Sequence, residues 1–169
     1  RAEGLYQDQK KYRVSPEEIL SHSFFVHATE DFYVFYRNKM IYQEAVPNIA
    51  HKTLAKLESL GKVKAIITQN IDGLHQLAGS KTVIELHGSI NRNYCVKCNK
   101  LYSLAEILTY TKVPYCDCGG IIKPDVVLYE EGLDGEILDK AVKYIENADV
   151  LIIGGTSLVE IGRASCRER

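Results

Sequence analysis

The sequence lacks a surplus of charge of either sign. Its 169 residues include 21 Lys and Arg and 22 Asp and Glu, which gives a formal net charge of -1 at pH 7. Proteins that bind nucleic acid or anionic lipid through bulk electrostatic attraction carry a strong excess of basic residues. The balance of charge therefore argues against nucleic acid as a partner and against attachment to a charged membrane surface.

The sequence also lacks a long apolar run and a leader-like start. Its longest apolar run, around residues 150–153, is far shorter than the about 20 residues of a membrane-spanning helix, and it indicates a buried strand. The first four residues do not show the basic and then apolar pattern of a secretory signal. We therefore expect no membrane span and a cytoplasmic location. In that reducing compartment, clustered cysteines bind metal more often than they form disulfides.

What the sequence does contain is an ordinary globular composition, with 46% hydrophobic and 25% charged residues. Short apolar segments alternate with segments of helical periodicity. Strands are predicted at residues 63–68, 82–86, 125–129 and 149–153. Helices are predicted from Ser15, over 32–42, over 49–60, near 104–108 and over 135–147. This alternation predicts an α/β fold whose parallel sheet is covered by helices on both faces.

Polar residues follow three of the predicted strands. Residues 69–72 come after the first strand, His87 and Gly88 after the second, and residues 154–157 after the last. In sheets of this class, ligands bind beyond the carboxyl ends of the strands. The sequence therefore predicts a ligand site built from these segments.

Four cysteines occur in two close pairs, Cys95 with Cys98 and Cys116 with Cys118. Two glycines follow the second, tighter pair and supply the backbone freedom that a tight turn needs. Zinc takes four thiolates in a tetrahedron, and two chelating pairs joined by a loop form a zinc ribbon. A redox-active pair is the main alternative, but it does not need a second pair. We predict one structural zinc ion, because a closed four-thiolate site leaves no open position for catalysis.

Residues 160–169 change abruptly in composition and show neither helical nor strand periodicity. We interpret them as a foreign tail, with a natural basic tail as the alternative. The fifth cysteine, Cys166, lies in this segment and is left out of the zinc site.

Several short motifs occur together in one order. They are Pro47-Asn48 with His51, residues 68–75 (TQNIDGLH), residues 85–88 (ELHG), the cysteine pairs, residues 123–127 (KPDVV) and residues 155–157. In this combination the chain, from about Gly4 to Val159, resembles the bacterial type of the sirtuin family of NAD-dependent protein deacylases. The resemblance implies a Rossmann-like sheet with a small zinc-ribbon module and a helical module.

The resemblance also implies a reaction. The acyl oxygen of an acylated lysine in a protein or peptide attacks the ribose of NAD, nicotinamide leaves, and the acyl group ends on ADP-ribose. His87 matches the family's general base, and imidazoles titrate in the range that such a base needs. A structural histidine at a strand end is the alternative. His51 and His75 are interpreted as packing or capping histidines.

Further residues match family positions that contact NAD. Gln69 and Asn70 match contacts to the ribose on the nicotinamide side, with Asn70 also counted as catalytic, and Asp72 matches the residue that recognises the carboxamide. An Asx-type turn is a second role open to Asn70 and Asp72. A cofactor-binding loop is matched by Gly155, Thr156 and Ser157.

The substrate strand is matched by residues whose main chain pairs with the acyl-lysine peptide in the family. They are Val126, Val127 and Tyr129. A plain core strand is the alternative reading of these side chains. Desuccinylase-type members carry a Tyr-x-x-Arg pair, whereas here Tyr36 follows Tyr33 and Arg37 stands one place later. This departure favours simple acyl groups such as acetyl.

The expected organisation has five parts. They are the end of a cofactor-binding loop with the helical module (1–45), the Rossmann-like part (46–90 and 124–159), the zinc ribbon (91–123) and the tail (160–169). The family's glycine-rich phosphate turn is absent, and the match ends near Val159. We therefore expect this polypeptide to bind NAD weakly and to show little activity. A non-catalytic zinc-binding interaction module is the alternative function.

Overall fold

The structure is a computed structural model that describes residues 14–156. Ser157 and the predicted tail at 160–169 lie outside the described residues. The elements, in chain order, are α1 (Pro16–Ile19), α2 (His22–His27), α3 (Thr29–Phe35), the π-helical turn η1 (Tyr36–Met40), α4 (Ile49–Ser59), β1 (Ile66–Thr68), α5 (Leu74–Leu77), β2 (Val83–Glu85), β3 (Gly88–Cys95), β4 (Leu101–Ser103), α6 (Leu104–Leu108), β5 (Ile122–Val126) and α7 (Gly135–Glu146).

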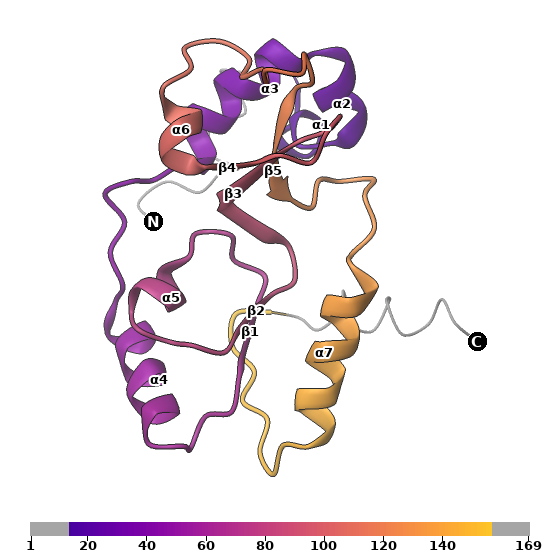
Figure 1. Ribbon diagram of the computed structural model, residues 1–169. Coiled ribbons are helices and arrows are strands. Elements are labelled where there is room, and N and C mark those ends of the chain that lie inside the picture. The colour runs from indigo at the N-terminus through magenta and orange to yellow at the C-terminus, as the bar shows by residue number, and fades with distance from the viewer. Residues whose placement is uncertain (1–13, 157–169) are drawn as a thin grey trace, which may run out of the picture.

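These elements form two lobes (Figure 1). The upper lobe holds α1, α2, α3, α6 and the sheet β4-β3-β5, and the lower lobe holds α4, α5, α7 and the sheet β1-β2. The chain crosses between the lobes after η1, between β2 and β3, and after β5. Among the described residues, no helix combines the length and the apolar character needed to cross a membrane.

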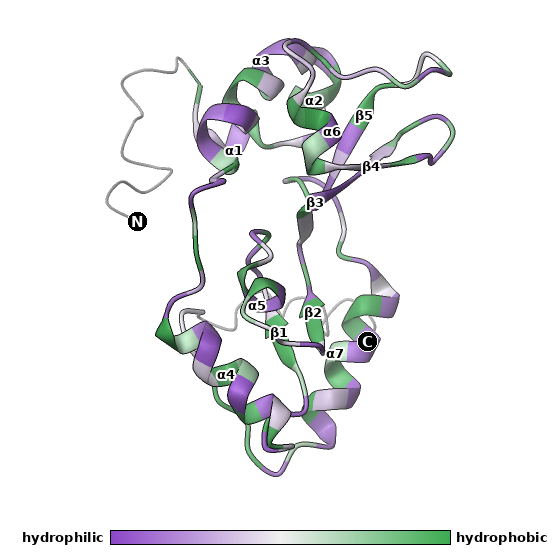
Figure 2. Cartoon of the chain, turned by 60° about the vertical axis from the view of Figure 1, so that its left-hand side comes forward, coloured by the Kyte–Doolittle hydropathy of each residue, from purple (hydrophilic) through white to green (hydrophobic). Residues whose placement is uncertain are grey.

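The lower lobe is built on the parallel pair β1-β2, in which Ile66 lies opposite Val83. Figure 2 shows this sheet between α4 and α5 on one side and α7 on the other. The face toward α7 is apolar, because Ile84 and Leu86 pack with Ala141 of that helix. The parallel pairing and the helices on both faces confirm the predicted α/β class.

Local sequence signals define the helices of this fold. Ser15 caps α1 through the main-chain N–H of Glu18, and Asn48 caps α4 in a capping box with His51. Asp134 accepts main-chain N–H bonds at the start of α7. All three starts agree with the predicted helices, and His51 has the capping role that the sequence indicated.

The core of the upper lobe is aromatic. Phe32 is fully buried, and its ring packs edge-on against Phe25 and Tyr33 at centroid distances of 5.1 and 5.4 Å. The Tyr33 hydroxyl donates to the main-chain oxygen of Ile122 in β5. The rings therefore hold the helices against the three-stranded sheet.

Two of the predicted strands differ in the structure. The third, predicted at 125–129, is β5, which ends at Val126 and pairs antiparallel with β3. The fourth, predicted at 149–153, is not a strand, and Val150 and Ile152 are 76% and 84% exposed. An apolar run supplies strand propensity only, whereas a strand also needs a partner for its main-chain groups.

Four elements were not predicted: α2, α5, β3 and β4. A strand is recognised in a sequence by alternating apolar and polar residues. In β3 this alternation is interrupted, because its register against β5 shifts between Ser89 and Asn93. The helix α5 has only four residues and begins after Gly73 in a left-handed conformation.

Truncating the central ring tests the role of the aromatic core. We expect Phe32→Ala to lower the free energy of unfolding by about 3–5 kcal/mol, because a fully buried ring is lost and a cavity is left. Urea denaturation followed by circular dichroism measures this change. Val34→Ala, on the same helix but 50% exposed, is the matched control and should change it by less than about 0.5 kcal/mol. Equal losses in the two variants would contradict this assignment of the core.

Candidate functional site

The four paired cysteines come together at one end of the upper lobe. Their sulfur atoms all lie within 4.8 Å of one another. The Sγ atoms of Cys95 and Cys118 are 3.4 Å apart, and those of Cys98 and Cys116 are 3.6 Å apart. Sulfurs around a tetrahedral zinc ion with Zn–S bonds of about 2.3 Å lie about 3.8 Å apart. The predicted set of ligands is therefore positioned for one zinc ion.

The surrounding main chain favours thiolates at this cluster. The N–H of Lys97 donates to the sulfur of Cys95 at 3.4 Å. The N–H of Cys118 donates to the sulfur of Cys116 and, together with hydrogen bonds from the side chains of Tyr102, Cys118 and Cys98, lowers the pKa of that thiol to about 6. Because zinc binds the thiolate form, these bonds favour metal binding at neutral pH.

Gly120 gives the tight second knuckle its shape. A Cβ atom at this position would lie 2.5 Å from the sulfur of Cys95 and 2.7 Å from the Cβ of Lys97. The sequence suggested that two glycines supply backbone freedom here. Gly119 does so with a φ of 79°, whereas Gly120 acts through the space it leaves for a ligand.

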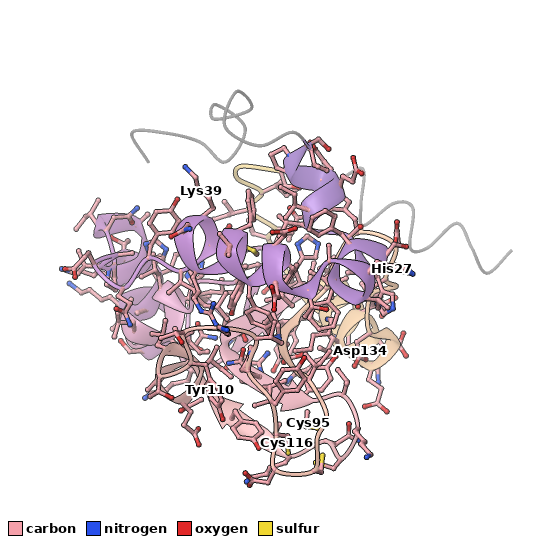
Figure 3. All side chains as sticks on the ribbon, turned by 90° about the horizontal axis from the view of Figure 1, so that it is seen from above. His27, Lys39, Cys95, Tyr110, Cys116 and Asp134 are labelled. Carbon is pink, nitrogen blue, oxygen red and sulfur yellow. The ribbon has the colours of Figure 1, made fainter. Side chains whose placement is uncertain are left out.

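A cavity of about 1340 Å³ lies between the two lobes. Its walls come from the segment after η1, the segment after β1, the crossing between β2 and β3, and the segment after β5. Figure 3 shows Cys95 and Cys116 together on the side away from Lys39, which lines the cavity. None of the four cysteines lines it. The metal site and the cavity are therefore separate.

Most of the residues that the motifs singled out line this one cavity. They are Gln69, Asn70, Asp72, His87, Val126, Val127 and Tyr129. His87 is half-buried, and its carbonyl oxygen accepts the N–H of Val127 at 3.1 Å. The chain thus brings the segments after β1, β2 and β5 to the same place, as expected for strand ends in an α/β protein.

The two turn residues after β1 differ in their local bonds. The Oδ1 atom of Asp72 accepts the N–H of Leu74 at 3.0 Å, which is the Asx-type turn considered for this position. Asn70 bonds through its main chain instead, because its N–H donates to the hydroxyl of Thr68 at 3.1 Å. Asp72 therefore has a structural bond in addition to its place in the cavity wall.

The cofactor-loop residues are not brought to this cavity. Gly155 and Thr156 are exposed and do not line it, while Ser157 lies outside the described residues. The tyrosines and arginine of the acyl-preference motif do not line it either. Tyr33 and Tyr36 are buried in the aromatic core, and Arg37 donates to the main-chain oxygens of Thr111 and Lys112.

Sequence reasoning missed an arginine that connects the strands around the cavity. Arg92 donates from Nη1 to Glu85 at 2.7 Å and from Nε to Asp125 at 2.8 Å. Burial alone would lower the pKa of Arg92, but these two carboxylates raise it. The arginine thus connects β2 to β5. No local motif indicates this contact, since Asp125 is 33 residues away along the chain.

Comparisons with known proteins agree with this geometry. The model of the Sir2 family matches residues 1–161. An NAD-dependent protein deacetylase of Clostridium tetani is 64% identical over 159 residues, which cover 93% of this chain and 64% of that relative. A solved Sir2 bound to acetylated peptide has a TM-score of 0.78 at 40% identity, covering 88% of this chain and 67% of the other. A Sir2 homologue solved with NAD has a TM-score of 0.82 at 38% identity, covering 91% and 61%. The chain thus spans less than two thirds of the Clostridium tetani relative.

Metal analysis tests the four-cysteine site. We expect the purified chain to hold one zinc ion, and Cys98→Ser to lose most of it, because a hydroxyl is a poor replacement for a thiolate ligand. Elemental analysis after dialysis measures the stoichiometry. Ser103→Ala, outside the four ligands, should keep its zinc. Full zinc content in Cys98→Ser would exclude that cysteine as a ligand.

A second variant tests the packing at the knuckle. We expect Gly120→Ala to weaken zinc binding at least about tenfold, because its methyl group would displace the sulfur of Cys95. Competition with a chromophoric chelator measures the affinity. Gly135→Ala is the control, since a Cβ there meets nothing within 4 Å. Unchanged zinc affinity in Gly120→Ala would show that the knuckle has room for a side chain.

Proposed function

This chain belongs to the Sir2 family, as its motifs predicted, and from that premise we propose that it is the core of an NAD-dependent protein-lysine deacetylase. The observation that supports this proposal best is the shared cavity. It gathers the motif residues from three separate segments, with His87 beside the proposed substrate strand. The solved relatives that bind NAD and acetylated peptide have the same fold.

The cavity fits a dinucleotide and a lysine side chain together. Pockets for drug-sized ligands measure about 300–1,000 Å³, and this cavity measures about 1340 Å³. When bound, NAD supplies the ribose that receives the acyl group and the nicotinamide that leaves. We propose that Gln69 and Asn70 contact that ribose and that Asp72 recognises the carboxamide. Amide and carboxylate side chains have the donors and acceptors for these contacts.

His87 is the proposed general base. His87 lines the cavity, and its imidazole would accept a proton at one ring nitrogen during acyl transfer. Val126, Val127 and Tyr129 are the proposed substrate strand. The N–H of Tyr129 donates to Leu20 and its carbonyl accepts from His22, so its own main chain is paired within the protein. Its half-exposed side chain is then the part that can meet a peptide.

The wall of the cavity favours neutral acyl groups. Its charged residues are Lys39, Glu44, Asp72, Glu130 and Glu131, which leaves a surplus of carboxylates. Among the described residues no arginine lines the wall to hold the carboxylate of a succinyl or similar acidic acyl group, and Arg37 is bonded elsewhere. Acetyl-lysine proteins or peptides are therefore the proposed substrates.

The proposed organisation keeps the predicted boundaries, with the Rossmann-like part at 46–90 and 124–159 and the zinc ribbon at 91–123. The four-cysteine cluster falls within the ribbon, and β1, β2 and α7 fall within the Rossmann-like part. A cytoplasmic location is also proposed. Its support is the cluster of four cysteines, because clustered cysteines bind metal rather than form disulfides in a reducing compartment.

Loss of the acetyl group from an acetyl-lysine peptide, measured by mass spectrometry of the peptide with and without NAD, tests the function. The chain is assayed as it stands and as a chimera in which it replaces the matching segment of the Clostridium tetani deacetylase. We expect NAD-dependent activity in the chimera, and a loss of at least about 100-fold in His87→Ala, because general-base catalysis supplies about that factor.

His27→Ala is the matched control for this assay. His27 is exposed on α2 and its ring bonds to the carbonyl of Ser23 within its own helix, so the variant should keep full activity. An inactive chimera beside an active Clostridium tetani enzyme would contradict the proposed function. Activity that survives His87→Ala would contradict the role of the base, whereas the inactive chimera would favour a non-catalytic zinc-binding module.

A further inference from the structure

A buried lysine lies directly behind the proposed substrate strand. Lys123 is 4% exposed, and its Nζ atom donates to the carbonyl of Val126 at 2.9 Å. The same Nζ atom lies 3.1 Å from Oε2 of Glu131, whose side chain is 21% exposed. Lysine is almost never this buried without a partner, because removing its charge from water is costly.

Glu131 bonds to the main chain after the substrate strand as well as to Lys123. Its Oε2 atom accepts the N–H of Leu128 at 2.8 Å, and its Oε1 atom lies 2.9 Å from Nδ1 of His22. Burial works to raise the pKa of Glu131, but the bonds from Leu128, His22 and Lys123 outweigh it and lower the pKa. Glu131 thus connects Lys123 and Leu128, on the segment that carries the substrate strand, to His22 at the start of α2.

The neighbouring residue fastens the same loop to α2. Glu130 has a positive φ of 76°, which is rare for a side-chain residue, and its carboxylate accepts the N–H of Ser23 at 2.8 Å. The main chain of Tyr129 makes a parallel bridge with Ser21. Residues 126–131 are therefore fixed by side-chain bonds to Lys123 in β5 and to the start of α2.

We propose that Lys123 and Glu131 are positioning residues for the substrate strand, and that their ion pair sets the path of residues 126–129 before peptide binds. The inference rests on the proposed function. Lys123 does not line the cavity, and both carboxylate oxygens of Glu131 are bonded within the protein. Their bonds to Val126 and Leu128 satisfy main-chain groups that would otherwise need water or a different loop path.

The test compares three variants in whichever of the chain and the chimera is active. They are Lys123→Met, Glu131→Gln and the two combined. Lys123→Met leaves the Glu131 carboxylate without its lysine, whereas the double variant removes both charges and keeps a side chain of similar size at each place. Lys100→Met is the matched control, because Lys100 pairs with Asp117 at 3.0 Å on the exposed surface of the zinc ribbon.

We expect KM for the acetyl-lysine peptide to rise more than about tenfold in Lys123→Met and in the double variant, since bonds to charged groups are lost. KM for NAD should change less than about twofold, and kcat should change less than KM for the peptide. Amide hydrogen exchange should show lost protection at Leu128. Lys100→Met should match the parent in every measurement.

A purely structural role gives a different pattern. A lower melting temperature with unchanged KM for the peptide in the folded protein overturns the positioning role. An equal rise in KM for the peptide and in KM for NAD overturns the positioning role too. A parent protein without deacetylase activity refutes the proposed function and this inference together, whereas an active parent whose variants keep their KM refutes the inference alone.

Discussion

The close passage of Gly88 against β5 governs how the two lobes meet. A Cβ atom at this position would lie 2.0 Å from the main-chain oxygen of Asp125, and φ is 74°. Only glycine allows both the conformation and the approach. His87 directly precedes this contact, and its carbonyl oxygen receives the N–H of Val127. The main chain of the proposed base is therefore hydrogen-bonded directly to the proposed substrate strand, which fixes the two relative to each other.

The strand β3 connects this contact to the metal site. It begins at Gly88 beside the cavity and ends at Cys95 in the four-cysteine cluster. The core around that cluster is small, consisting of a few side chains such as Tyr102, Ile107 and Ile122. A module with so little apolar volume needs a metal to stay folded. Zinc therefore acts on the cavity only through the order of β3 and β5, and a role in bond-making is excluded by its distance along the strand and its closed ligand set.

The sequence was informative where the physical signal is local. Caps at Ser15, Asn48 and Asp134 define helix starts within one turn, and cysteine spacing defines the metal site. The gathering of Gln69, Asn70 and His87 in one cavity also followed from the rule on strand ends. The sequence was misleading at 149–153, where a strand was predicted from apolar character alone although the segment has no pairing partner in the described structure.

Long-range polar contacts could not be predicted in the same way. Arg92 bonds to Asp125, 33 residues away, and His22 bonds to Glu131, 109 residues away. None of these four residues belongs to a local sequence motif that indicates its partner. Only the folded arrangement shows that these charges converge on the strands around the cavity.

The buried pair of Lys123 and Glu131 has an energetic meaning that a surface ion pair lacks. Desolvating two charges costs about as much as their attraction returns, so apolar residues of similar size would give comparable stability. Apolar residues cannot, however, donate to the carbonyl of Val126 or accept from the N–H of Leu128. An unpaired buried main-chain group costs about 1–3 kcal/mol, so the loop would take another path to reach solvent. The ion pair is therefore better explained by the main-chain path it selects than by the stability it adds. That path places the strand against His87.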